Sequence, residues 1–122
     1  MRVAWVEIPV KDIDRALAFY KAVFDLEPLI SIADEVRRVA VLISDDQTGL
    51  SLNQTLNFEP NHDGPLAYID MEQDFAAHLA LVESAGGKIL CPTTPMDKTT
   101  VYAIIEDTEG NAVAMHYWRK PA

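Results

Sequence analysis

The sequence predicts an α+β fold in which the order strand, helix, strand, strand, strand occurs twice. Each half opens with an apolar strand-like stretch, followed by a segment whose apolar residues recur at helical spacing. The segment NFEPNHDGP, rich in turn-forming residues, separates the two halves. With 122 residues, 49% of them hydrophobic, the chain is long enough to bury one core. We therefore expect a single domain over residues 1–122, with module one at about 1–57, a linker at about 58–65 and module two at about 66–122.

The first module is predicted from residues 3–10, a strand rich in β-branched residues with Pro9 near its end. Asp12 is a good helix N-cap. The apolar residues of the helix that follows share one face: Ile13, Ala16, Leu17, Tyr20, Val23 and Phe24. Three strands complete the module, at about residues 28–32, at 36–44, and in the stretch LSLNQT.

The second module repeats this order after the linker. LAYIDM is predicted as a strand and residues 75–85 as a helix, which Gly86 and Gly87 end because glycine adopts left-handed backbone angles without strain. KIL begins the next strand, and residues 92–99 are expected to form a loop. TVYAIIED and AVAMHYW are the last two strands. The acidic turns SDD and EDTE are expected to be solvated.

Composition narrows the range of partners and compartments. The formal net charge of −9 argues against nucleic acid or an anionic membrane as a partner. Cys91 is the only cysteine, so no intrachain disulfide is possible. The first residues lack the apolar run of a signal peptide, and no later segment resembles a membrane span, so we expect a cytoplasmic protein. The histidines, His62, His78 and His116, are scattered.

Three stretches carry a family resemblance. VEIPVKDIDRALAFYKAVF resembles the opening of the vicinal oxygen chelate superfamily, ESAGGKILCP its second helix end and strand, and EDTEGNAVAMHYW its last hairpin. Members include glyoxalase I, fosfomycin-resistance enzymes, extradiol dioxygenases and bleomycin-resistance proteins. The resemblance implies two βαβββ modules whose curled mixed sheets surround a cup-shaped cavity that binds a ligand. It also implies a homodimer in which the cup is often shared between subunits.

The resemblance also locates the four positions at which metal-dependent members place a ligand. Here they fall on Trp5, on Ala114, within residues 51–54, and on one of Pro65, Leu66 and Ala67. None of these offers the imidazole, thiolate or carboxylate that a divalent transition metal needs. We therefore expect no cofactor and no family-type metal. This argues against glyoxalase I, dioxygenase and fosfomycin-transferase chemistry by the family's standard mechanism.

Strand alternation predicts which side chains face the cup. If Trp5 faces inward, so does Glu7, whereas Val6, Ile8 and Val10 face the helices. The same argument applies to the last strand. It turns Ala112, Ala114, His116 and Trp118 inward, and Val113, Met115 and Tyr117 toward the helices. The orientation of Tyr68 and Tyr102 stays open. The candidate ligand-binding residues are Trp5, Glu7, His116, Trp118 and Tyr102.

Three functions fit these candidates. Two indoles with a carboxylate and an imidazole suit a small aromatic or cationic ligand, bound without chemistry as in bleomycin-resistance proteins. Alternatively, the protein is a lyase or isomerase in which Glu7 and His116 are the catalytic acid and base, or part of a non-standard metal site. In the third hypothesis the domain only dimerises or regulates, with its cup filled by its own side chains. Trp5 and Trp118 would also suit a dimer interface. Whether the protein is an enzyme stays open.

Overall fold

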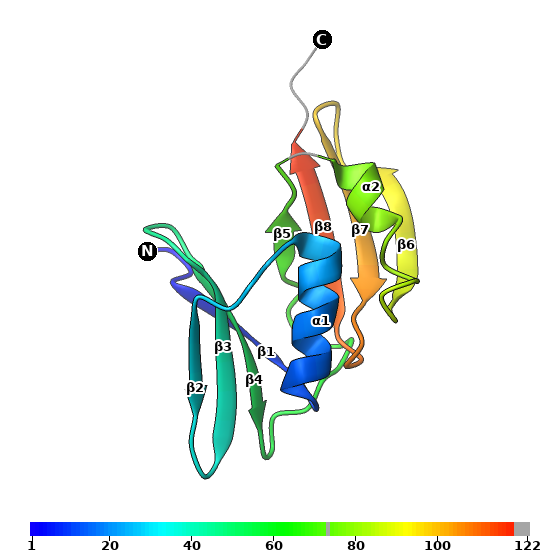
Figure 1. The fold of residues 1–122 in the computed structure, drawn as a ribbon. Helices are drawn as coiled ribbons and strands as arrows, with labels where there is room; N and C mark the ends of the chain where they lie inside the picture. The colour runs from blue at the N-terminus through cyan, green and yellow to red at the C-terminus, as the bar shows by residue number, and fades with distance from the viewer. Residues whose placement is uncertain (73, 119–122) are drawn as a thin grey trace.

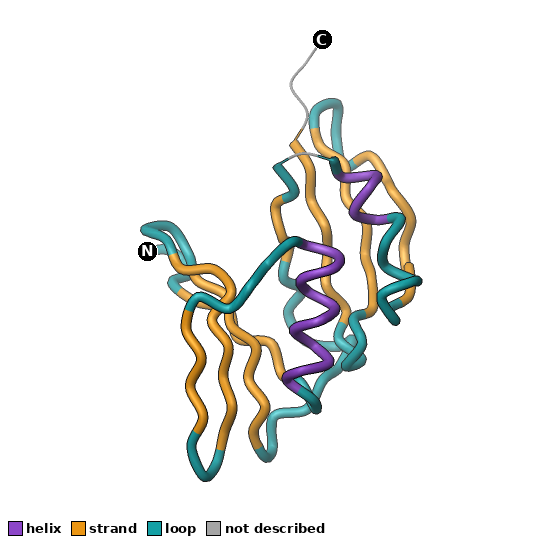
Figure 2. The backbone as a smooth tube through the Cα atoms, viewed as in Figure 1, coloured by secondary structure: helices purple, strands orange, loops and turns teal. Residues whose placement is uncertain are grey.

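The computed structural model describes residues 1–72 and 74–118, which form two four-stranded sheets and two helices (Figures 1 and 2). Module one consists of β1 (Trp5–Pro9), α1 (Ile13–Phe24), β2 (Ile30–Ala33), β3 (Arg37–Ser44) and β4 (Gly49–Thr55). Module two consists of β5 (Tyr68–Asp70), α2 (Phe75–Leu79), β6 (Lys88–Pro95), β7 (Thr100–Glu106) and β8 (Ala112–Trp118). The predicted α+β fold of two βαβββ modules is confirmed.

The two sheets have equivalent strand orders, β1-β4-β3-β2 and β5-β8-β7-β6. In each sheet the first strand of the module runs parallel to the last, and the other neighbours are antiparallel. Both sheets are therefore mixed, and neither closes on itself.

The start of α1 agrees with the prediction. Asp12 is its N-cap, and the carboxylate accepts hydrogen bonds from the backbone N–H groups of Asp14 and Arg15, both at 3.1 Å. The helix ends at Asp25, which adopts the left-handed conformation with φ of 56°. These local signals position the helix directly after β1.

Two elements of module two differ from the prediction. Helix α2 ends at Leu79 rather than at residue 85, because the chain tightens into i→i−3 turns, in which Leu81 and Val82 donate to His78 and Leu79. Strand β6 continues to Pro95, where a loop was expected. β6 is the edge strand of its sheet, so a proline without an N–H can occupy it without breaking the ladder.

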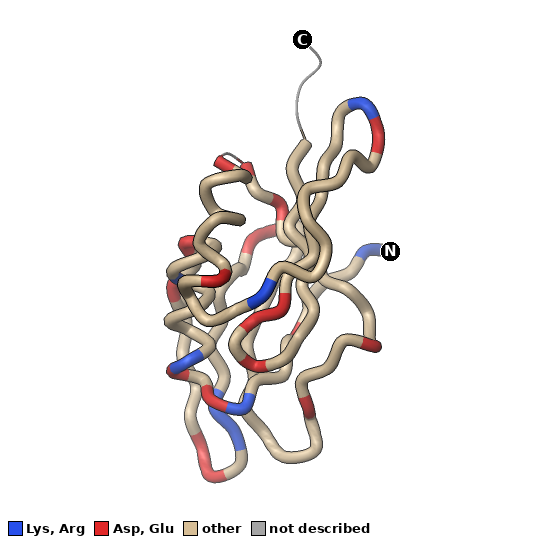
Figure 3. Tube along the Cα trace, turned by 90° about the vertical axis from the view of Figure 1, so that its right-hand side faces the viewer, with Lys and Arg blue, Asp and Glu red and all other residues tan. Residues whose placement is uncertain are grey.

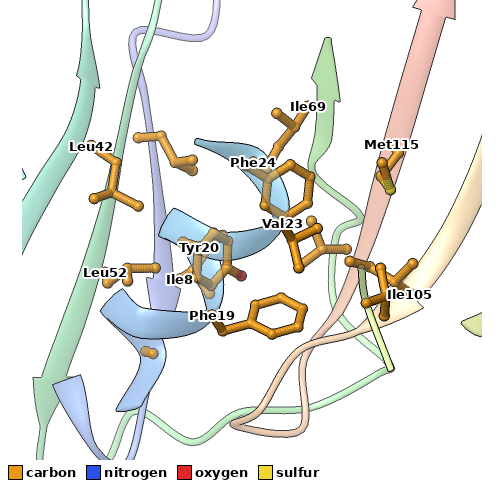
Figure 4. Close-up of a cluster of buried hydrophobic side chains, with 14 of the residues drawn as sticks. Ile8, Phe19, Tyr20, Val23, Phe24, Leu42, Leu52, Ile69, Ile105 and Met115 are labelled. Carbon is orange, nitrogen blue, oxygen red and sulfur yellow. The ribbon is translucent and has the colours of Figure 1, made fainter. Parts of the chain in front are cut away.

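A single hydrophobic core lies between the sheets, with α1 at its centre (Figure 4). Aromatic and β-branched side chains of α1 pack against both sheets: Phe19, Tyr20, Val23 and Phe24. The first sheet contributes Ile8, Leu42 and Leu52, and the second contributes Ile69, Ile105 and Met115. One face of each sheet is therefore buried against α1. We call the opposite faces the outer faces.

The turn at residues 107–111 joins the two modules, contrary to the prediction that EDTE is solvated. Asp107, Glu109 and Asn111 are all buried. Asp107 accepts a hydrogen bond of 2.8 Å from the Tyr20 hydroxyl, and the Asn111 side chain donates to the Pro9 carbonyl at 2.7 Å. The turn therefore holds the corner between β1 and α1. The other acidic turn, SDD, is exposed as predicted.

Candidate functional site

The parallel register of β1 and β4 builds a polar cluster on the outer face of the first sheet. Trp5 lies opposite Gly49, Glu7 opposite Ser51, and Pro9 opposite Asn53. Alternation points the side chains between them into the core, where Ile8 is buried. Trp5 and Glu7 thus share the face predicted for them. The orientation of β1 is confirmed.

A chain of hydrogen bonds connects the cluster. The Trp5 Nε1–H group donates to Ser51 Oγ at 3.0 Å, and the Ser51 hydroxyl donates to Glu7 Oε2 at 3.4 Å. From the other side, Asn53 Nδ2 donates to Glu7 Oε1 at 2.6 Å. Ser51 and Asn53 are only 1% and 7% exposed, whereas Glu7 is exposed. Ser51 and Asn53 therefore hold the Glu7 carboxylate from the buried side, and the carboxylate retains unused acceptor positions toward solvent.

The Trp5 indole is held in place by its neighbours on β4. It lies directly over Gly49, where an added Cβ would approach the ring carbons to 2.2 Å. Together with the bond to Ser51, this contact restricts the ring to one position. The side chain nevertheless remains 45% exposed, so the indole offers a fixed apolar surface beside Glu7.

Asn53 has an unusual feature. Its Oδ1 is buried and, among the residues that the structure describes, has no hydrogen-bond partner. The residues opposite it in register are Pro9 and Val39, whose side chains carry no donor. A buried acceptor without a partner is costly and uncommon.

A cleft of about 330 Å³ lies beside this cluster. Its walls come from β1 between Trp5 and Pro9, from Phe58 and Asn61 of the linker, and from Ala112 at the start of β8. A second depression of about 400 Å³ lies at the end of β4 and contacts none of the candidate residues. The cleft beside β1 is therefore the one associated with the predicted site.

The other predicted residues lie on the outer face of the second sheet. Tyr102 is opposite His116, and Thr100 is opposite Trp118, which ends the described part of β8. The Tyr68 ring meets the His116 ring edge-on, with centroids 6.4 Å apart. Tyr68 and Tyr102, whose orientation the sequence left open, therefore share the face of His116. The His116 Nδ1 atom lies 3.5 Å from Asp70 Oδ1.

The five candidates thus form two groups on different sheets. Trp5 and Glu7 belong to the first sheet, and His116, Trp118 and Tyr102 belong to the second, with α1 between the sheets (Figure 1). Within the described part of one chain, no hydrogen bond joins Glu7 to His116. Glu7 accepts from Ser51 and Asn53, and His116 lies beside Asp70.

Two participants were missed as site residues by sequence reasoning. Ser51 and Asn53 were considered only as poor metal ligands, yet they orient both Trp5 and Glu7. The signal was present in LSLNQT, where polar residues alternate with the buried Leu50 and Leu52. Their contact with Glu7 depends on the register of β1 against β4, which the sequence does not show.

The residues present do not fit the metal that the family implies. At the four positions discussed above, the side chains are an indole, a methyl group, hydroxyl or amide groups, and the apolar Pro65, Leu66 or Ala67. Ser51 and Asn53 already bond within the cluster, and Glu7 is its only carboxylate. Across residues 1–72 and 74–118, no group of three or more His, Cys, Asp or Glu could hold a metal ion. We derive no step through a metal.

Comparison with known proteins identifies the family. The model of the Glyoxalase/Bleomycin resistance protein/Dioxygenase superfamily matches residues 2–115. The chain belongs to this superfamily. No curated protein sequence matches it. Within the described residues, no helix is both long and apolar enough to cross a membrane.

Solved structures of the superfamily share the fold. A mutant of glyoxalase I from Zea mays superposes with a TM-score of 0.76 at 20% identity, over 98% of this chain and 46% of the maize chain. The present chain of 122 residues thus spans about half the length of the maize chain. A glyoxalase family protein from Bacillus cereus matches with a TM-score of 0.75 at 14% identity, over 98% of this chain and 95% of its own. A glyoxalase/bleomycin resistance protein from Albidiferax ferrireducens gives 0.67 at 16% identity, over 97% and 98%.

Proposed function

We propose that this superfamily member binds a small aromatic or cationic organic molecule at the outer face of β1 and β4, without a family-type metal. The observation that carries the proposal is the hydrogen-bonded chain of Trp5, Ser51, Glu7 and Asn53 beside a cleft. A fixed indole supplies apolar area and attracts cations to its face. An adjacent carboxylate with unused acceptor positions orients a polar group.

The charge of the whole chain supports the cationic alternative. Asp and Glu number 19 against 10 Lys and Arg, and acidic residues recur along the trace in Figure 3. A negative surface raises the local concentration of cations and speeds their association. Charge alone also serves solubility, so the specific support comes from Glu7.

We further propose that a second copy of the chain completes the site. Both outer faces expose large apolar side chains, Ile30 and Ile32 with Trp5 on the first sheet, and Tyr68 with Trp118 on the second. Covering one kind of face with the other would remove these side chains from water. It would also bring His116, Tyr102 and Trp118 of one subunit opposite the Trp5–Glu7 cluster of the other. The cup would then lie between the subunits.

Fluorescence tests the binding proposal, because the chain has only two tryptophans. Trp118→Phe leaves Trp5 as the sole indole, and Trp5→Phe leaves Trp118. In a titration with small aromatic amines and neutral aromatic compounds, we expect the Trp118→Phe protein to show a saturable change in Trp5 emission, with weaker affinity than the natural chain because Trp118 of a second copy also lines the proposed site. Replacing both Trp5 and Glu7, by Phe and Gln, should abolish binding as measured by calorimetry. Binding that survives this double replacement would place the ligand elsewhere.

Sedimentation equilibrium tests the assembly. We expect a mass of twice 13.6 kDa for the natural chain. Ile32→Glu should shift the mass toward the monomer, because it places a charge on an apolar outer face. Leu81→Glu, which places the same charge on an exposed apolar residue just after α2, is the matched control. A monomer at all concentrations would contradict the shared cup.

A further inference from the structure

The polar groups of the Trp5–Glu7 cluster show which kind of ligand the site accepts. Each donor atom already has an acceptor inside the cluster. Trp5 Nε1 donates to Ser51, the Ser51 hydroxyl donates to Glu7, and Asn53 Nδ2 donates to Glu7. Asn53 Nδ2 keeps a second N–H, and the unused capacity that faces solvent belongs to the Glu7 carboxylate, whereas the Oδ1 of Asn53 is buried.

The orientation of the Asn53 amide follows from Glu7. If the amide were turned over, its oxygen would lie 2.6 Å from a carboxylate oxygen, and two acceptors would face each other. The negative charge of Glu7 therefore keeps the nitrogen toward itself and the oxygen away. No hydrogen bond within the described part of the chain reaches that oxygen. The site thus presents one negative charge to solvent, and the Asn53 amide holds that carboxylate in place.

We propose that the ligand carries a slim cationic group with N–H donors, a primary ammonium or an amidinium, next to an aromatic ring. This inference rests on the proposed function and narrows its ligand class. The N–H groups donate to the open acceptor positions of Glu7, and the ring packs on the Trp5 indole. A quaternary ammonium has no N–H to donate, and its methyl groups keep it from a close approach to the carboxylate.

The spacing of the two anchors agrees with such a molecule. Trp5 and Glu7 are two residues apart on one strand face, a separation of roughly 6.6 Å along β1. Because Ser51 Oγ lies 3.0 Å from Trp5 Nε1 and 3.4 Å from Glu7 Oε2, the indole edge and the carboxylate are no further apart than the sum of these two distances, and an arylmethylamine stacked on the indole can reach the carboxylate. The 330 Å³ cleft beside β1 has room for a ligand of this size. Because Gly49 and Ser51 hold the indole in place, little order is lost when the ring stacks.

Three probes with the same ring separate the contributions: benzylamine, benzyltrimethylammonium and benzyl alcohol. We measure their dissociation constants with the natural chain by calorimetry. We expect benzylamine to bind at least about ten-fold more tightly than either other probe, the factor of one charge-assisted hydrogen bond. Glu7→Gln should remove this preference and leave the affinity for benzyl alcohol unchanged. Asn53→Ala should reduce it.

Glu83→Gln is the matched control, because it removes the same charge from an exposed residue outside the cluster. It should keep the full preference for benzylamine. If benzyltrimethylammonium or benzyl alcohol binds as tightly as benzylamine, or if Glu7→Gln keeps the preference, the N–H donor assignment is overturned and the proposed function stands. If none of the three probes binds at millimolar concentration, the proposed function is overturned together with it.

Discussion

Glu7 and Glu109 are both glutamates at strand or turn positions, yet their surroundings are opposite. The Glu109 side chain is 0% exposed and accepts hydrogen bonds from the backbone N–H groups of Lys11 and Asp12, from Arg15 and from the Thr108 hydroxyl. Glu7 is exposed and accepts from Ser51 and Asn53 only. A carboxylate whose acceptor positions are filled stabilises the fold. One with open positions is available to a ligand.

The difference follows from the cost of burying charge. A buried carboxylate is unfavourable unless donors surround it. Burial raises the pKa of Glu109, but the hydrogen bonds from Arg15, Asp12, Thr108 and Lys11 outweigh burial, and the net pKa is lowered. These hydrogen bonds connect the last hairpin to the start of α1. Glu7, at the surface, requires fewer partners.

The largest expected effect comes from removing Glu109. Glu109→Ala leaves two backbone N–H groups and the Arg15 guanidinium without their acceptor, so the free energy of unfolding should fall by about 3 kcal/mol. Urea denaturation measures it. Glu83→Ala is the control, with an expected change within about 0.5 kcal/mol. A loss as small as that of the control would show that the turn does not hold the modules together.

Low pH should weaken the connection that Glu109 makes between the last hairpin and the start of α1. Because the pKa of Glu109 is lower in the folded chain than in the unfolded chain, its contribution is complete above the unfolded pKa. That contribution is lost as the pH falls through the lowered folded value. Glu109→Gln should therefore flatten the decline of the free energy of unfolding below about pH 4.5. Equal slopes for both proteins across that range would rule out a role for this carboxylate in acid unfolding.

A smaller loss of stability is expected from a change beside the Trp5–Glu7 cluster. Gly49→Ala places a methyl group where the Trp5 ring now lies, so the indole must move and lose its bond to Ser51. Because the side chain is partly exposed, the stability cost should be about 1 kcal/mol. In the Trp118→Phe background, Trp5 emission should shift to longer wavelength. An unchanged emission maximum would mean that the ring does not rest on Gly49.

The smallest effect on stability is expected for Glu7. Glu7→Gln keeps the size of the side chain and removes a charge that water already reaches, so the free energy of unfolding should change by less than about 0.5 kcal/mol. Thermal unfolding checks this. A loss comparable to that of Glu109→Ala would make Glu7 a structural residue, and the contrast between the two glutamates would disappear.

Much of the fold and part of the site could be predicted from local patterns. The alternation of β1 and β8 predicted that Glu7 and His116 point away from the helices, and Asp12 marked the start of α1. Such features depend on periods of two or 3.6 residues, which neighbouring residues express directly. The pattern of elements also predicted both modules. The helix end at Leu79 and the strand through Pro95 were wrong, because edge position and turn geometry overrode local preference.

By itself, the sequence determined the two βαβββ modules and the orientation of β1 and β8. Only the tertiary structure decided which carboxylate is structural. Glu109 lies 94 residues from Arg15, and Glu7 lies 46 residues from Asn53. The sequence shows that Glu7 and Glu109 are both acidic. Their burial and their hydrogen-bond donors depend on which residues the folded chain places beside them. That is why an acidic turn expected in water holds the modules together, and why Glu7 remains open to a ligand.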